Sequence, residues 1–158
     1  MTIYNINRKI SVNDNINNVF HFFSDANNLE ILTPPWLNFK ILDIIPKTMG
    51  VGTQIRYRLK LHGIPIWWTS VITEWNPPYS FTDEQKKGPY KSWIHNHTFE
   101  SIENGTIIKD NVNYSIPFGS FPGGSLIHTL FVKNDVRKIF DFRKEKMSEL
   151  FFRIKTEE

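Results

Sequence analysis

Apolar and polar residues alternate along most of this chain, which is typical of strands that bury one face and expose the other. The clearest case is residues 53–61, where apolar side chains share one parity and basic side chains share the other. Turn-forming residues separate such segments, and Asn104-Gly105 is the strongest hairpin signal among them. The pattern therefore predicts seven strands, at residues 4–12, 39–45, 53–61, 64–75, 81–86, 93–103 and 106–116.

Three other segments show helical spacing of their apolar residues. After the first strand, Asn13 or Asp14 is suited to cap a short helix. A second short helix at residues 26–33 would end at Pro34-Pro35, because proline breaks helices. A Gly/Pro-rich bridge at residues 119–124 then leads to a long C-terminal helix, which we expect to begin between residues 125 and 133.

This order of elements predicts an α+β fold, with residues 1–158 forming one domain. We expect a strongly curved, seven-stranded antiparallel sheet, with two short helices after the first strand. The long C-terminal helix is amphipathic, so it must lay its apolar side on the apolar face of the sheet.

Hairpin turns set strand register, and register assigns each side chain to a face of the sheet. A two-residue loop at 62–63 pairs Tyr57 with Trp68, and the Pro77-Pro78 turn places Ser70 near Gln85 and Ile72 near Asp83. With a two-residue loop at 104–105, paired positions are Phe99 with Asp110, His97 with Val112 and His95 with Tyr114.

These registers bring ionisable groups onto a face that is otherwise apolar. Burying a charge is costly unless it is paired or solvated, so the groups either pair with one another or line a cavity. We expect pairing of Asp83 with His95, and of Asp110 diagonally with His97. A few polar groups in an aromatic-lined hollow are typical of small-molecule sites. The candidate ligand-binding residues are Tyr57, Trp68, Asp83, Gln85, Trp93, His95, His97, Asp110 and Tyr114.

Composition narrows the function classes. The net charge is only +3 and the basic residues do not cluster, which argues against nucleic-acid binding. There is no cysteine, so disulfides and thiolate chemistry are excluded. No apolar run is long enough for a transmembrane helix, and the N-terminus lacks a signal-peptide pattern. We therefore expect a cytoplasmic protein; nothing in the pattern indicates its oligomeric state.

Six runs of residues, in order, are similar to one known family: LTPPWLNFKI, YRLKLHGIPIWW, ITEWNPPYSFTDEQ, GPYKSWIHNHTF, NYSIPFG and IFDFR. Together they resemble the SRPBCC (START-like, helix-grip) superfamily over nearly the whole chain, and most of all its small bacterial cyclase/dehydrase-like branch. The resemblance implies a cavity between the sheet and the C-terminal helix. Relatives bind lipids, sterols, quinones or polyketides, and some catalyse cyclisation or dehydration, but the resemblance supplies no catalytic residue for this chain.

His95 and His97 admit several interpretations. They can be structural, as neutral imidazoles hydrogen-bonded to neighbouring carboxylates. They can recognise the polar end of an apolar guest, together with Gln85. They can transfer protons, with Asp110 orienting His97 as a general acid or base. A lone His-x-His is a weak metal signal because no third ligand follows from the spacing, so we predict no metal and no cofactor. The helical pattern leaves open whether Arg143 reaches the cavity.

We expect a non-catalytic protein that binds a small, largely hydrophobic molecule, such as a lipid, a quinone or a polyketide-like compound. The alternative is a cyclase or dehydratase acting on a polyketide-like or lipid substrate by His/Asp acid–base chemistry. A third possibility is an interaction module whose cavity is filled by side chains. A cavity below roughly 300 Å³ would count against the binding hypothesis.

Overall fold

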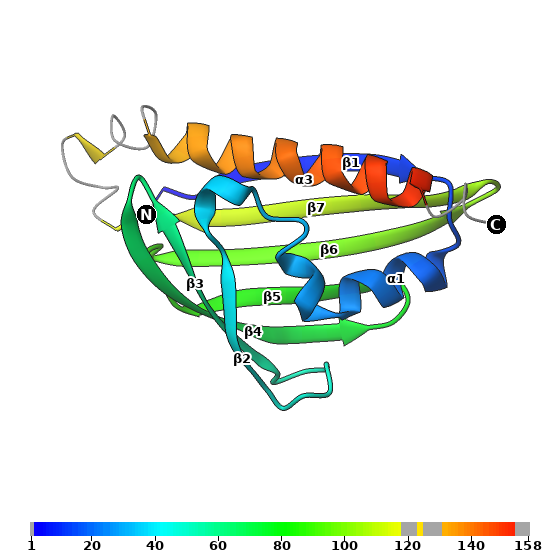
Figure 1. The fold of residues 1–158 in the computed structure, drawn as a ribbon, viewed down its shortest axis with the longest axis horizontal. Coiled ribbons are helices and arrows are strands. Elements are labelled where there is room, and N and C mark those ends of the chain that lie inside the picture. Colours follow the sequence, from blue (N-terminus) through cyan, green and yellow to red (C-terminus); the bar gives the residue numbers. More distant parts are fainter. Residues whose placement is uncertain (1, 118–122, 125–130, 154–158) are drawn as a thin grey trace.

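The computed structural model describes residues 2–117, 123–124 and 131–153 (Figure 1). One antiparallel sheet contains all of the strands, in the spatial order β1-β7-β6-β5-β4-β3-β2. The strands are β1 (Tyr4–Val12), β2 (Lys40–Ile45), β3 (Gln54–Leu61), β4 (Ile64–Asn76), β5 (Ser80–Lys87), β6 (Ser92–Ile102) and β7 (Gly105–Ser115). The alternation therefore predicted each of these strands to within two residues.

The helices lie on one face of this sheet (Figure 1). They are α1 (Ile16–Ser24), the 3-10 helices η1 (Ala26–Leu29) and η2 (Pro35–Leu37), and the long helix α3 (Lys133–Arg153). Helix α3 packs along β1, and α1 packs against β6. This arrangement confirms the helix-grip fold. Among the described residues, no helix combines the length and the apolar character that crossing a bilayer requires.

Two predicted details of the helices differ from the structure. Asn15, rather than Asn13 or Asp14, caps α1, because its side-chain oxygen accepts a hydrogen bond from the Asn18 backbone N–H (3.0 Å). The second short helix, predicted at residues 26–33, is regular only over η1, and Pro35 opens η2 instead of merely ending a helix. Most of the bridge at 119–124, and part of the range in which the long helix was expected to begin, lie outside the described residues.

The β3–β4 hairpin has the predicted register, with Tyr57 opposite Trp68 and Ser70 opposite Ile55. His62 and Gly63 form its turn with positive φ at both positions (50° and 78°). A two-residue turn of this kind matches the twist of the strands that flank it. The predicted pairs of β4 with β5, Ile72 with Asp83 and Ser70 with Gln85, are also present.

The β6–β7 register was predicted wrongly by two residues. His97 lies opposite Asp110, and Ile102 lies opposite Gly105. The turn is therefore centred on Glu103 and Asn104, one residue earlier than expected. Gly105 belongs to β7, where a Cβ would lie 1.9 Å from the Val12 carbonyl oxygen. The glycine at this position thus permits close approach to β1 rather than forming the centre of the turn.

Two groups of buried apolar residues form the core. One surrounds Phe20, whose ring contacts Phe81 and Phe99 edge-on. The other joins Val112 and Tyr114 of β7 to Val136 and Phe140, which lie in the N-terminal half of α3. Both groups contribute residues to a cavity between the sheet and the helices.

Candidate ligand site

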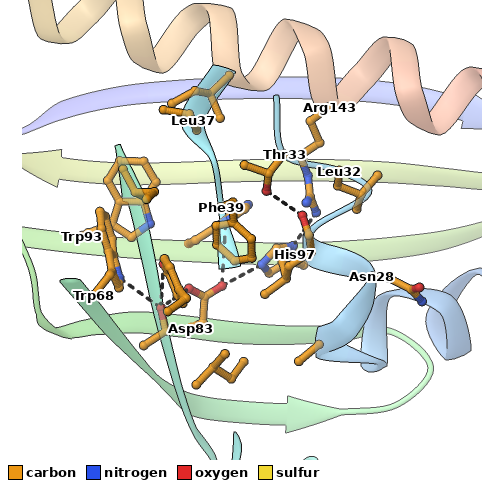
Figure 2. Close-up of a pocket in the computed structure, with 18 of the residues that line it drawn as sticks. Asn28, Leu32, Thr33, Leu37, Phe39, Trp68, Asp83, Trp93, His97 and Arg143 are labelled. Carbon is orange, nitrogen blue, oxygen red and sulfur yellow. Dashed lines mark hydrogen bonds and ion pairs between the residues drawn. The ribbon is translucent and has the colours of Figure 1, made fainter. Parts of the chain in front are cut away.

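A cavity of about 180 Å³ lies between the concave face of the sheet and helix α3 (Figure 2). The segment containing η1 and η2 contributes apolar side chains to it, including Leu32, Leu37 and Phe39. Trp68 and Trp93 line it from the sheet, and Phe140 lines it from α3. The part of the chain between α1 and β2 therefore completes a hollow that the sheet and α3 alone would leave open.

The volume sets an upper limit on what fits in this conformation. At about 180 Å³ the cavity is below the roughly 300 Å³ given in the sequence analysis, so its volume counts against the binding hypothesis for any drug-sized guest. It is larger than the roughly 150 Å³ of an apolar cavity that accommodates benzene. The cavity as described therefore has room for a guest of about one aromatic ring.

Stacked aromatic residues form one wall of the cavity. The Tyr57 ring stacks on Trp68, with centroids 5.8 Å apart and planes at 16°. Trp93 meets Trp68 edge-on at 5.4 Å. The indole N–H of Trp68 donates to the Ser70 hydroxyl (3.2 Å), and that hydroxyl donates a longer bond to Asp83 Oδ1 (3.4 Å). These bonds fix the wall and connect it to a charged group.

Five ionisable side chains meet beside this wall, and we call them the Asp–His cluster: Asp83, His95, His97, Asp110 and Arg143. Asp83 lies on β5, the histidines on β6, Asp110 on β7 and Arg143 on α3. Asp83 is the most accessible of the five, with 18% of its side chain exposed, against 2% for Asp110. Figure 2 shows Asp83 between the tryptophans and His97. Asp83 is thus the carboxylate of the cluster that a guest can reach.

The shortest bonds in the cluster cross between neighbouring strands. His97 Nε2 lies 2.8 Å from Asp83 Oδ2, and His95 Nε2 lies 2.9 Å from Asp110 Oδ1. The expected pairs, His95 with Asp83 and His97 with Asp110, exist as longer contacts of 3.8 and 3.2 Å. The two imidazole rings are tilted by 32° with their centroids 3.6 Å apart, so each can approach both carboxylates. The cluster is one network rather than two separate pairs.

Arg143 completes the network from helix α3. Its Nε donates to Asp110 Oδ2 (3.0 Å) and its Nη2 donates to Asp110 Oδ1 (3.3 Å). Nη2 also lies 3.4 Å from His97 Nδ1. A bidentate guanidinium of this kind is a strong partner for a buried carboxylate. The Arg143 guanidinium therefore offsets the free-energy cost of burying the Asp110 carboxylate.

These contacts set the charge of each group. Burial alone would raise the pKa of Asp110, but Arg143 and the histidine hydrogen bonds outweigh it and hold that pKa well below its usual range. Burial also opposes ionisation of Asp83, yet its bond to His97 keeps its pKa low. Burial and the neighbouring His97 lower the pKa of His95 to about 4. For His97, burial alone would lower the pKa, but the hydrogen bonds and charges of Asp110 and Asp83 together outweigh burial and raise it.

The predicted site residues divide into two groups. Six of them line the cavity: Tyr57, Trp68, Asp83, Trp93, His95 and His97. The other three lie behind that lining. Asp110 supports the histidines, Tyr114 packs against Trp93 (5.7 Å), and Gln85 is bonded to the Tyr90 backbone through both its amide nitrogen (2.7 Å) and its oxygen (3.1 Å).

Sequence reasoning did not place two residues that shape the site. Tyr90 lines the cavity and packs against Trp68 and Trp93. Arg143 was left open, because helical spacing alone does not give the rotation of a helix about its axis. The signal that favours Arg143 is charge balance, since two carboxylates on a buried face require a cation from the element that covers them.

Comparison with known proteins adds to this geometry. The family model described as polyketide cyclase/dehydrase and lipid transport matches residues 14–143. The chain belongs to this family. The match confirms the SRPBCC resemblance and covers every member of the Asp–His cluster. No curated protein is similar enough in sequence to be matched.

Solved structures with the same fold resemble this family member along almost all of its length. Protein CV1439 from Chromobacterium violaceum has a TM-score of 0.71 at 14% identity, covering 94% of this chain and 97% of that chain. Protein Ms6760 from Mycobacterium smegmatis has a TM-score of 0.65 at 14% identity, covering 95% and 92%. Truncated norcoclaurine synthase from Thalictrum flavum has a TM-score of 0.65 at 14% identity, covering 91% and 92%. At this identity the similarity shows the fold alone.

Proposed function

We propose that this protein binds a small, largely hydrophobic molecule in the cavity between its sheet and helix α3. The observation that carries the proposal is an apolar, aromatic-walled cavity into which the partly exposed Asp83 carboxylate of the cluster opens. The family description, which includes lipid transport, agrees with it. The cavity volume favours a one-ring compound, or one ring of a quinone or polyketide-like molecule, over a long lipid chain.

The geometry assigns each part of the guest to a part of the wall. Tyr57, Trp68 and Trp93 contact its apolar portion, where a planar guest gains from stacking. Asp83 and Ser70 face its polar group and accept hydrogen bonds from it. We propose that the protein binds its guest in the cytoplasm, because the chain contains no cysteine.

Native mass spectrometry of the purified protein tests this function. We expect added mass from a guest that is released on denaturation. Ile66→Trp places a larger side chain in the cavity lining, and it should remove that mass. Ile64→Trp is the matched control, because Ile64 lies on the same strand but is 65% exposed. Equal guest occupancy in both variants would contradict the proposed site.

Acid–base catalysis is the second candidate, and the contact of His97 with Asp83 at 2.8 Å beside the cavity favours it. In a dehydration, protonated His97 would donate its proton to the hydroxyl that leaves as water, the Asp83 carboxylate would take the proton from the carbon next to the carbonyl group, and Asp83 would then return that proton to His97. The recovered guest distinguishes the two candidates. A binding protein returns it unchanged, whereas a dehydratase returns it lighter by one water, and His97→Gln should abolish that change.

A further inference from the structure

Three potential metal ligands converge in the Asp–His cluster. One ligand atom each from Asp83, His95 and His97 can be chosen so that all lie within 4.8 Å of one another. The histidines alternate along β6, and Asp83 is opposite His95 on the neighbouring strand. The sheet thus supplies the third ligand that the spacing of His-x-His could not reveal.

The imidazoles are oriented as metal-binding histidines usually are. One ring nitrogen of each histidine contacts Oδ1 of Asp110: Nε2 of His95 at 2.9 Å and Nδ1 of His97 at 3.2 Å. Metal-binding histidines commonly donate their second ring N–H to a carboxylate, which fixes the tautomer. Here that arrangement turns His95 Nδ1 and His97 Nε2 toward Asp83.

The distances among these donors suit a small cation. Asp83 Oδ2 lies 2.8 Å from His97 Nε2 and 3.8 Å from His95 Nδ1. In a tetrahedral site with bonds of 2.0–2.2 Å, donor atoms lie about 3.4 Å apart. The two observed separations lie on either side of that value, so donor-atom shifts of about half an ångström would bring all three donors to bonding distance from one metal ion.

Charge and access also favour a cation at this position. Two carboxylates face one guanidinium in the cluster, so one further positive charge is accommodated. Arg143 approaches His97 from its Nδ1 side, opposite to the Nε2 that faces Asp83 (Figure 2). Its guanidinium therefore does not occupy the space between the three donors.

We propose that Asp83, His95 and His97 bind a divalent first-row transition metal, with Asp110 and Arg143 holding the imidazoles in position. Two imidazoles and one carboxylate suit Zn²⁺ or Fe²⁺ and do not suit Mg²⁺ or Ca²⁺. All three ligands line the cavity, so the remaining coordination positions open toward a guest. The metal does not require the hydrophobic guest, but both would use Asp83, so a guest with an oxygen donor would bind next to the metal.

Titration of the chelator-treated, guest-free protein with Co²⁺ tests the site. We expect one Co²⁺ per chain, visible absorption bands of a four- or five-coordinate ion, and displacement by one equivalent of Zn²⁺ but not by Mg²⁺. Asp83→Asn and His95→Gln should each weaken Co²⁺ binding at least ten-fold. His62→Gln is the matched control, since His62 contacts Asp135 (2.8 Å) outside the cluster; it should leave binding unchanged.

Absence of saturable binding, or equal affinity in Asp83→Asn, would overturn the proposal. X-ray absorption of the zinc-loaded natural sequence needs no variant, so it decides the question even if the substituted proteins do not fold. Two imidazole ligands are expected, and fewer than two would overturn the site. Because neither measurement uses a guest, failure here is distinct from failure of the hydrophobic-binding proposal, which the mass of a co-purified guest tests.

Discussion

His95 and His97 are identical side chains whose ring centroids lie 3.6 Å apart, yet their pKa values move in opposite directions. Both are buried, which disfavours the charged form. His97 contacts both carboxylates at 3.2 Å or less, whereas His95 has one such contact, with Asp110. At the residue scale, the number of close carboxylate contacts decides which imidazole carries the proton.

This difference predicts a stability maximum near pH 6.5 in the metal-free protein. Between pH 6.5 and about 4, the unfolded chain binds a proton at His95 that the native protein does not, so stability falls as the pH falls. The stabilising contribution of His97 is fully present below pH 6.5 and is lost as the pH rises through its raised native pKa. The acid limb is on the order of 3 kcal/mol, at about 1.36 kcal/mol for each unit by which the His95 pKa is lowered.

Urea denaturation across pH 4–9 measures both limbs. His95→Gln should flatten the acid limb above pH 4, and His97→Gln should flatten the alkaline limb. Below pH 4, protonation of Asp83 and Asp110 destabilises both variants, because their native pKa values are lowered. A natural protein whose stability rises from pH 6.5 to pH 8 would contradict the assignment of the proton to His97.

Removal of Arg143 should be the most damaging single change in the cluster. Arg143→Met keeps an unbranched apolar side chain but leaves the buried Asp110 without its guanidinium, and breaking a buried pair costs about 3–5 kcal/mol. Arg8→Met is the control, because Arg8 pairs with the half-exposed Asp141 at the surface and should cost at most about 1 kcal/mol. Equal losses in the two variants, measured by urea denaturation, would show that Asp110 does not depend on Arg143.

At the scale of elements, the sequence predicted the strands well because alternation is a local signal. The β6–β7 register was missed because the signal of Asn104-Gly105 does not reveal which residues stand at the centre of the turn. The shift was two residues, and side chains alternate with a period of two, so every residue kept its predicted face. The candidate site survived the error for that reason. The orientation of α3 about its own axis places Arg143 against Asp110, and that orientation depends on packing that the spacing of apolar residues does not describe.

Gly105 tests the corrected turn. Gly105→Ala would place a methyl group against the Val12 carbonyl oxygen at a position with positive φ, so we expect a loss of more than about 1 kcal/mol in stability. Gly50→Ala is the control, because a Cβ at Gly50 meets nothing within 4 Å. Thermal denaturation compares the two. A loss at Gly105 no larger than that at Gly50 would show that β1 and the turn are not in close contact.

At the scale of the whole molecule, the sheet, the α1–β2 segment and α3 enclose a hollow that no single element forms. Six of the nine residues predicted for the site line it, all of them on β3 to β6, whereas its lining from the α1–β2 segment and from α3 was not predicted. Its volume was not predictable, because volume depends on how closely α3 and the 3-10 helices approach the sheet. That approach determines whether the interior holds a guest or is filled by its own side chains.

The five tryptophans allow the central claim to be measured directly. In a ¹H–¹⁵N NMR titration with a one-ring apolar compound such as toluene, the indole N–H signals of Trp68 and Trp93, which line the cavity, should shift and saturate. The signals of Trp67 and Trp36, which are 64% and 47% exposed, should stay in place. Unchanged Trp68 and Trp93 signals, or equal shifts at all four positions, would contradict a ligand-binding cavity between the sheet and helix α3.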